Sequence, residues 1–515
     1  MIEGLCRIFN CIPYRQEGFS SVHGDAAMVI GMRLGPNTYS ASHFYDELID
    51  RDGSARPHAA RLADYFSAMR PEELIARQRA VDKTIVDLGI SFTIYSEGDN
   101  IDRAWPLDII PRAMPGDEWN QIEAGLVQRL RALNLFIDDL YNDRRILKDK
   151  VVPSEIIDSS RNYLQPCRGV SPRHGVWANI CGSDLVRGGD GTVYVLEDNL
   201  RVPSGVSYML ENRNVIKRVF PGLFQDHRVR PVSEYPTSLS VMLQSIAPPD
   251  ASGEKPEIVV LTPGIYNSAY FEHSYLARTM GVELVEGGDL VVGDDDCAYL
   301  RSIEGLRRVD TIYRRIDDVF LDPEVFRPDS MLGVPGLMRA WRAGNVSLAN
   351  APGSGVADDK VVYSYVPDII RYYLQEDAII PNVPTWRCSE PKHLDHVLAK
   401  LPELVVKPAN ESGGYGMLVG PHATRKEHEQ FRELLQANPR NYIAQPTLDL
   451  STAPTLCGES LEPRHLDLRP FILQGDSIAV TAGGLTRVAM RKGSLVVNSS
   501  QGGGSKDTWI VEANH

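Results

Sequence analysis

The chain has 515 residues, of which 43% are hydrophobic and 24% are charged, and its formal net charge is −14. A chain of this length exceeds a single hydrophobic core, so we expect two or three packed lobes. The acidic balance argues against a nucleic-acid-binding surface, which needs clustered Lys and Arg, but it does not exclude a nucleotide.

The seven cysteines are widely spaced and contain no C-x-x-C pair. Such spacing is typical of reduced thiols rather than of a disulfide framework or a zinc site. No apolar run reaches the roughly 20 residues that span a bilayer, and the first forty residues lack the apolar core of a signal peptide. We therefore expect a cytoplasmic protein without a membrane partner, and we treat residues 1–43 as an N-terminal extension.

The first elements that the sequence predicts are two helices. Residues 70–89 and 116–143 carry apolar side chains at helical spacing, and the second has Leu126, Leu130 and Leu133 along one stripe. The segment that follows, GVWANICGSDLVRGGDGTVYVLEDN, predicts two strands joined by a Gly–Asp turn.

This hairpin carries three side chains with oxygen donors. Glu197 follows Asp184 by thirteen residues, and Asn199 lies two residues further on. Side chains alternate along a strand, so Glu197 and Asn199 share a face, and Asp184 can oppose them across the pair. Carboxylate and amide oxygens suit Mg²⁺, which leaves its other positions to water and phosphate. An exposed hairpin with acids for solubility is the alternative, although β-propensity disfavours an Asn in a strand.

The amino-acid composition changes near the middle of the chain. A stretch rich in Pro, Ser and Gly near 230–256 indicates a boundary. Beyond it, strand, helix and strand patterns alternate, and the helix ends on Gly281. This alternation predicts a small parallel α/β domain over residues 256–345. A Gly- and Pro-rich segment then leads into a last lobe of short strands.

A strand followed by a Gly-rich loop is the main phosphate-binding candidate in the last lobe. The strand delivers Lys407, and glycines let backbone N–H groups close around phosphate oxygens. The loop residues are Glu411, Ser412, Gly413, Gly414 and Gly416. Neither common nucleotide fingerprint is present, and an ordinary hairpin with glycines at its turn is the alternative.

Other candidates surround this loop. Lys360 lies at a predicted helix start, and Gln445 ends a strand whose backbone would reach an adenine edge. Arg469 lies on a strand, and Arg487 and Asn498 precede a second glycine run. Each charge alone is more simply a solvated side chain. Their clustering at strand ends and Gly-rich turns favours a binding site.

Together these segments resemble the ATP-grasp superfamily, whose E-x-N-x-x-P-G pattern compares with EDNLRVPSG here. In that superfamily the lysines and the loop precede the metal ligands, whereas here the metal set comes first. The reversed order indicates a circular permutation, with coincidence as the alternative. Permutation also predicts that an α/β pre-ATP-grasp domain lies between the two halves, which is the place of residues 256–345.

More specifically, the chain resembles the circularly permuted ATP-grasp type 2 family, and its relatives include glutathionylspermidine synthase-like proteins. The motifs are YDEL, RALNLFIDDLY, YVLEDNLRVPSGVSYMLENR, YRRIDDVFLDP, ADDK, VVKPANESGGYG and NSSQGGGSKDTW. The resemblance implies a mixed α+β and α/β ATP-grasp fold with an inserted pre-ATP-grasp domain at 256–345. Residues 44–235 would form the N-terminal helical region and metal-ligand half, and residues 346–515 the lysine and Gly-loop half.

The resemblance also implies ATP and Mg²⁺ as cofactors and assigns roles. Lys360 and Lys407 would bind phosphates under the 411–416 loop, and the three hairpin donors would hold the metal. Arg469 or Arg487 would stabilise the transferred phosphoryl group.

The implied activity is ATP-dependent joining of a carboxylate to an amine through an acyl phosphate, with small-molecule or peptide substrates. An ATP-dependent phosphotransferase and a catalytically inactive nucleotide-binding assembly partner are the alternatives. Weaker substrate candidates are Arg201, Arg314, Arg315 and Asn498. A guanidinium pairs bidentately with a carboxylate, but structural salt bridges fit these arginines equally well.

Overall fold

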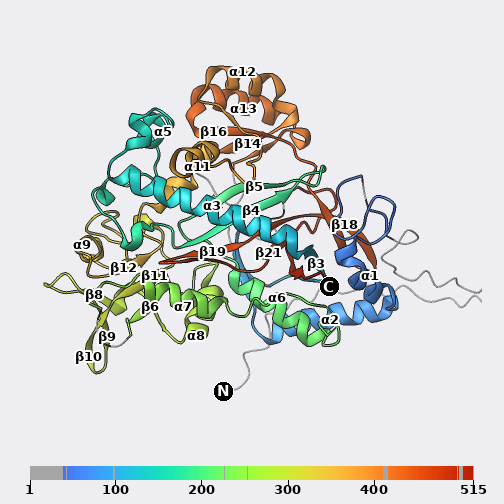
Figure 1. Cartoon of the computed structure of the whole chain (residues 1–515), viewed down its shortest axis with the longest axis horizontal. Coiled ribbons are helices and arrows are strands. Elements are labelled where there is room, and N and C mark those ends of the chain that lie inside the picture. Colours follow the sequence, from blue (N-terminus) through green and yellow to red (C-terminus); the bar gives the residue numbers. More distant parts are fainter. Residues whose placement is uncertain are drawn as a thin grey trace, which may run out of the picture.

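The computed structural model describes residues 39–513, except positions 42, 97–98, 226, 252, 254, 410–415, 496 and 498–502. The described chain forms a large central sheet body and two smaller lobes that are also built on sheets (Figure 1). Within this part of the chain, no helix is long and apolar enough to cross a membrane.

The central sheet has nine strands within the described residues. Its order is β20-β19-β4-β18-β21-β22-β3, with β5 paired to β4 and β17 paired to β18. β22 runs parallel to β3, and the other pairs are antiparallel. The strands are β3 (Leu107–Pro115), β4 (Ile180–Arg187), β5 (Val193–Asn199), β17 (Thr452–Cys457), β18 (Ser460–Arg469), β19 (Phe471–Gln474), β20 (Ile478–Val480), β21 (Leu485–Val488) and β22 (Gly504–Val511).

Strands from distant parts of the sequence alternate in this sheet. β4 lies between β18 and β19, which follow it by almost three hundred residues, and β3 takes β22 as its neighbour. The sheet is therefore completed only when residues 107–199 meet residues 452–511. Backbone groups of one half satisfy those of the other, so neither half has a complete sheet alone.

The helix α3 (Gly116–Tyr141) crosses the sheet and builds the main core (Figure 1). It confirms the helix expected over 116–143. Its stripe residues Leu126, Leu130 and Leu133 are buried, in one cluster with Trp177 from the hairpin's approach and Leu468 from β18. Burying each leucine contributes about 1.5–3 kcal/mol. The position of α3 over the hairpin is therefore fixed by apolar packing.

A second core contains residues of α2 (Pro71–Asp87) and α6 (Val206–Val219) together with the fully buried Trp509 of β22. α2 confirms the helix expected over 70–89, and it begins with Pro71 at its first turn. The remaining elements of this body are α1 (Ala60–Ser67), β1 (Ser91–Ser96), β2 (Asp99–Ala104), α4 (Arg145–Lys148) and α5 (Ser154–Asp158).

A four-stranded parallel sheet forms the second lobe. Its order is β12-β11-β6-β7, and every pair is parallel. Helix α8 (Tyr270–Met280) is capped by Gly281, whose φ of 71° lies in the left-handed region that glycine adopts without a Cβ clash. The elements are α7 (Tyr235–Ser245), β6 (Ile258–Leu261), α8 (Tyr270–Met280), β7 (Glu283–Val285), β8 (Leu290–Val292), β9 (Ala298–Ser302), β10 (Gly305–Val309), β11 (Thr311–Arg314), α9 (Leu337–Ala343) and β12 (Ser347–Ala349). The role of this lobe as a pre-ATP-grasp domain stays a prediction.

The third lobe has a small antiparallel sheet in the order β13-β16-β14-β15, next to two helices (Figure 1). Val397, Val406 and Leu435 form its separate core. Its elements are β13 (Trp386–Arg387), α12 (Pro391–Lys400), β14 (Leu404–Pro408), β15 (Leu418–Val419), α13 (Arg425–Ala437) and β16 (Tyr442–Pro446), and α10 (Lys360–Tyr363) and α11 (Val366–Leu374) lead into it.

Glu47, in the YDEL segment, ties the N-terminal part to the central sheet. Its carboxylate accepts hydrogen bonds from Arg112 Nη2 at 2.7 Å, Arg187 Nε at 3.2 Å and Ser451 Oγ at 2.7 Å. Burial alone would raise the pKa of Glu47, but the guanidinium groups of Arg112 and Arg187 outweigh burial and hold that pKa at about 2. The carboxylate therefore joins β3 and β4 through charge in the interior, and a hydrogen bond connects it to the residue before β17.

We expect Glu47→Ala to lower the free energy of unfolding by about 3–5 kcal/mol, because the buried Arg112 loses its carboxylate partner and the buried Arg187 keeps only Glu118. Asp87→Ala removes a carboxylate from an exposed pair with Lys83 and should cost no more than about 1 kcal/mol. Urea denaturation at pH 7 checks both. The contribution of Glu47 to the free energy of unfolding should be complete above pH 4.5 and should be lost as the pH falls towards 2. Equal losses in the two variants would contradict this assignment.

Candidate functional site

The β4–β5 hairpin places the three predicted oxygen donors on one face of the sheet. Asp184 is directly opposite Glu197, and Gly182 is opposite Asn199. Opposed residues of an antiparallel pair point to the same side, and Glu197 and Asn199 are two residues apart on β5. The Asn199 Nδ2 donates to the carbonyl oxygen of Gly182 at 3.0 Å, which orients the amide.

The opposite face of the hairpin is fixed by a buried ion pair. Arg129 of α3 donates from Nε to both carboxylate oxygens of Asp198 at 2.9 Å, and from Nη2 at 2.7 Å. Ser183 adds a hydrogen bond to Asp198 at 2.8 Å. Because Asp198 lies between Glu197 and Asn199 in sequence, this pair sets the direction in which both donors point.

Asp184 binds both arginines that were predicted to be catalytic. Arg469 donates from Nε at 2.5 Å and from Nη2 at 2.8 Å, and Arg487 donates from Nη2 at 2.7 Å. Arg487 also pairs with Asp467, two residues before Arg469 on β18. Burial would raise the pKa of Asp184, but the two guanidinium groups outweigh it and hold that pKa well below its usual range.

Two lysines from the other half of the chain meet this face. Lys360 Nζ lies 3.4 Å from Glu197 Oε2, and the Lys360 backbone N–H donates to the carbonyl of Ala409 at 3.0 Å. Burial and the positive charge of Lys360 lower the pKa of Lys407 to about 8, while the carboxylates of Glu197 and Asp184 act against that shift. Lys360, Lys407, Glu197 and Asp184 are thus close enough to affect one another.

The remaining nucleotide candidates are only partly described. Gln445 is buried on β16, opposite Val405 of β14, and its amide nitrogen donates to Thr385 Oγ1 at 3.0 Å. Gly416 has a φ of 67°, a left-handed conformation that strains other residues. The predicted residues Glu411, Ser412, Gly413, Gly414 and Asn498 lie outside the described residues, so their roles stay predictions.

Arg314 and Arg315 are both buried and bound within the protein. Arg314 donates from Nε to the carbonyl of Asn350 at 2.6 Å and pairs with Asp318 at 2.6 Å. Arg315 pairs with Glu272 at 3.1 Å and donates to the carbonyl of Pro203 at 2.8 Å. The hydrogen bond from Arg315 to Pro203 attaches the parallel lobe to the segment after the hairpin. The structure therefore does not present either guanidinium at an exposed surface.

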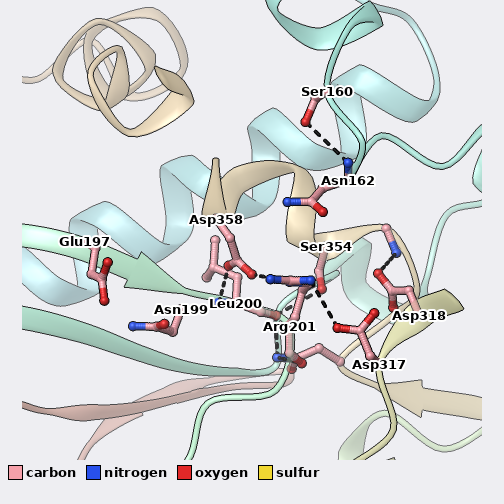
Figure 2. A network of polar contacts seen from close by, with 12 residues as sticks. Ser160, Asn162, Glu197, Asn199, Leu200, Arg201, Asp317, Asp318, Ser354 and Asp358 are labelled. Carbon is pink, nitrogen blue, oxygen red and sulfur yellow. Dashed lines mark hydrogen bonds and ion pairs between the residues drawn. The ribbon is translucent and has the colours of Figure 1, made fainter. Parts of the chain in front are cut away.

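Arg201 lies at the edge of the site, just beyond Asn199 (Figure 2). It donates from Nε to Asp358 at 2.7 Å and from Nη1 to Asp317 at 3.1 Å. Asp358 also accepts a hydrogen bond from the backbone N–H of Leu200 at 2.6 Å. Of the three predicted arginines, Arg201 is the one that retains exposure next to the hairpin donors.

Sequence reasoning selected Lys360 but missed the two acids before it. Asp358 holds Leu200 and Arg201, and Asp359 caps α10 by accepting from the N–H of Val361 at 2.8 Å. Asp358 and Lys360 of the ADDK motif therefore contact the hairpin half of the site, through Arg201 and Glu197, and Asp359 caps the helix that begins with Lys360. The signal was the adjacency of two carboxylates to a lysine at a predicted helix start, which is typical of N-capping. Asp467 was missed because no local pattern separates it from other strand acids.

The donor set fits a metal that is shared with phosphate oxygens. Within the residues that the structure describes, no group of three or more His, Cys, Asp or Glu side chains is placed to hold a metal ion. Glu197 and Asn199 supply two oxygens, and Asp184 is engaged by arginines. Mg²⁺ is commonly bound through one or two carboxylates with the remaining ligands from water and phosphate. The adjacent lysines supply the positive charge that a polyphosphate requires.

We expect the Lys407 ammonium to titrate near pH 8, and its neighbours to shift it in opposite directions. Glu197→Gln should lower the Lys407 pKa because a nearby negative charge is lost, and Lys360→Met should raise it because a nearby positive charge is lost. NMR titration of ¹³C-dimethylated lysines, with Lys407→Arg for assignment, measures both. Shifts of the same sign in the two variants would contradict the proximity of Lys407, Glu197 and Lys360.

Comparison with protein families gives a match over most of the described chain. The model described as "Circularly permuted ATP-grasp type 2" matches residues 111–489. A solved structure of a glutathione synthetase-like effector from Globodera pallida, in its apo form, superposes with a TM-score of 0.56 and 11% sequence identity. The match covers 86% of this chain and 98% of that chain, and it shows similarity of fold alone.

Two relatives show how the whole chain compares with known proteins. An uncharacterized protein of Synechocystis sp. is 55% identical over 478 residues, which cover 93% of this chain and 99% of that protein. A Frankia alni protein named "Putative glutamate–cysteine ligase 2-3" is 44% identical over 466 residues. That match covers 90% of this chain but only 54% of the Frankia protein.

Proposed function

Because the chain belongs to the circularly permuted ATP-grasp type 2 family, we propose that it is an ATP- and Mg²⁺-dependent ligase that joins a carboxylate to an amine. The observation that carries this proposal is the meeting of Lys360 and Lys407 with Glu197 and Asp184. The two acids and the two lysines lie more than 160 residues apart in sequence. A site that combines carboxylates with lysines is what the metal and phosphates of ATP require.

Each side chain has a role in this proposal. Lys360 and Lys407 bind the phosphates, and Glu197 and Asn199 hold the metal with Asp184 beside them. Mg²⁺, when bound, supplies positive charge to the β- and γ-phosphates. Arg487 and Arg469 stabilise negative charge on the transferred phosphoryl group.

The reaction has two steps. A carboxylate oxygen of the acid attacks the γ-phosphorus of ATP, the bond to the β–γ bridging oxygen breaks, and ADP leaves. A neutral amine then attacks the acyl carbon, the carbon–oxygen bond to phosphate breaks, and the nitrogen loses a proton. The products are an amide, ADP and phosphate. Exclusion of water from the acyl phosphate prevents hydrolysis.

The printed name of one relative supports a ligase. The name of the Frankia protein indicates ligation of a carboxylate to an amine, but this chain matches about half of that protein. The named activity can therefore reside in the other half. The placement of the parallel lobe between the hairpin and the lysine segments supports its role as the pre-ATP-grasp domain.

We expect Glu197→Ala and Lys407→Ala to reduce ADP release by about 100-fold or more, because each removes charge that the transition state needs. Glu429→Ala and Lys400→Ala serve as matched controls, since both side chains form exposed ion pairs on the third lobe and should leave activity unchanged. A coupled ADP assay with mixtures of candidate acids and amines measures the rates.

Analysis of the products separates the related activities. An amide formed in proportion to ADP supports the ligase, whereas a stable phosphorylated acceptor without an amide would indicate a phosphotransferase. Full ADP production in both Glu197→Ala and Lys407→Ala would overturn the site assignment.

Nucleotide affinity should also depend on pH through Lys407. Its pKa of about 8 in the free protein means that phosphate binding above pH 8 requires uptake of a proton. We expect the affinity for Mg·ADP to be constant below pH 8 and to fall by up to about tenfold per pH unit above it. Calorimetry at pH 7, 8 and 9 measures this. Lys407→Arg, which stays charged, should abolish the dependence, and an unchanged slope in that variant would contradict it.

A further inference from the structure

Arg201 and Asp317 form an ion pair that differs from the buried pairs around it. The distance from Arg201 Nη1 to Asp317 Oδ2 is 3.1 Å, and the side chains are 24% and 42% exposed. Asp358, the other partner of Arg201, is only 14% exposed and lies 2.7 Å from Nε. Of the two partners of Arg201, Asp358 is mostly buried and Asp317 is accessible to solvent. Within the described residues, no hydrogen bond from its Nη2 is found.

Both members of the pair are held in place without each other. Gly355 lies against the Arg201 stem so closely that a Cβ there would be 2.1 Å from Arg201 Cδ. The Asp358 carboxylate fixes Nε from the same segment. Asp317 caps a short turn by accepting from the Val319 N–H. A positive and a negative charge are therefore fixed side by side at the edge of the site (Figure 2).

The pair lies close to the predicted metal donors, and this position suggests what it could bind. Arg201 follows Asn199 by two residues, a spacing of roughly 6–7 Å along an extended chain. That length is comparable with the separation of the two carboxylates in a short amino diacid. A partly exposed ion pair adds little to stability, so it can be exchanged for a ligand that carries both charges.

We propose that Arg201 and Asp317 bind the amino-acid head group of the acid substrate, Arg201 its carboxylate and Asp317 its ammonium group. The second carboxylate of the same molecule then lies towards Glu197 and Asn199 and is the one that reacts. This inference rests on the proposed ligase function and names its substrate class, an α-amino diacid or a peptide that ends in one. A guanidinium fork and a carboxylate match these two groups in charge and geometry.

Calorimetric titration in the presence of Mg·ADP tests the proposal with matched probes. L-glutamate carries both head-group charges, 4-aminobutyrate lacks the α-carboxylate, and glutarate lacks the ammonium group. L-aspartate and L-2-aminoadipate vary the length by one methylene. We expect at least one of the three amino diacids to bind, and L-glutamate to bind about 10- to 100-fold more tightly than 4-aminobutyrate or glutarate.

Variants then assign the two charges. Arg201→Gln should remove the preference for L-glutamate over 4-aminobutyrate, and Asp317→Asn should remove the preference over glutarate. Arg327→Gln breaks an exposed Arg–Asp pair elsewhere, with Asp329, and should bind all probes as the native protein does. Unchanged melting temperatures exclude misfolding as the cause.

The outcomes distinguish a failure of the head-group site from a failure of the proposed ligase function. If Mg·ADP binds in a Lys407-dependent way but no amino diacid is preferred, the head-group site is wrong and the nucleotide site stands. The same conclusion follows if Arg201→Gln and Asp317→Asn retain native preferences. If Mg·ADP does not bind, the proposed function fails and this inference fails with it.

Discussion

The pairing of Asp184 with Arg469 and Arg487 is the interaction on which the site depends. The two arginines are 285 and 303 residues away in sequence, on β18, which is next to β4 in the sheet, and on β21, which is next to β18. Removing three charges from water is expensive unless every one is paired, and Asp467 completes the set by holding Arg487. The charges of both chain halves are therefore balanced only when the central sheet has formed.

The electrostatic balance of the site follows from this pairing. With Asp184 committed to arginines, Glu197 is left to face two lysines, and it pairs directly with Lys360. Burial is the main reason why the pKa of Lys407 is lowered, and the positive charge of Lys360 adds to that shift. An anion that entered between the lysines would favour the charged form of Lys407. Without an anion, the positive charges of the two lysines are not fully balanced, and binding of a polyphosphate would balance them.

Local patterns predicted the hairpin and the position of its donors, because side-chain alternation follows directly from strand geometry. The helices α2 and α3 were predicted for the same reason, from helical periodicity. Sequence could not predict that Asp184 would bind arginines, since no spacing rule connects residues about three hundred positions apart. It also could not separate Arg314, which is fully buried, from Arg201, which is not. That difference arises from tertiary packing alone.

The interleaving of distant strands in the central sheet has a consequence for how the protein folds. β4 cannot gain its neighbours β18 and β19, nor β3 its neighbour β22, until the last strands of the sheet have been synthesised. Pairings over such sequence separations are slow to form, because loop closure costs entropy before contacts repay it. A nascent chain would carry unpaired strand edges through much of translation, and such edges associate readily with other chains. Folding of this protein should therefore depend on protection of those edges during synthesis.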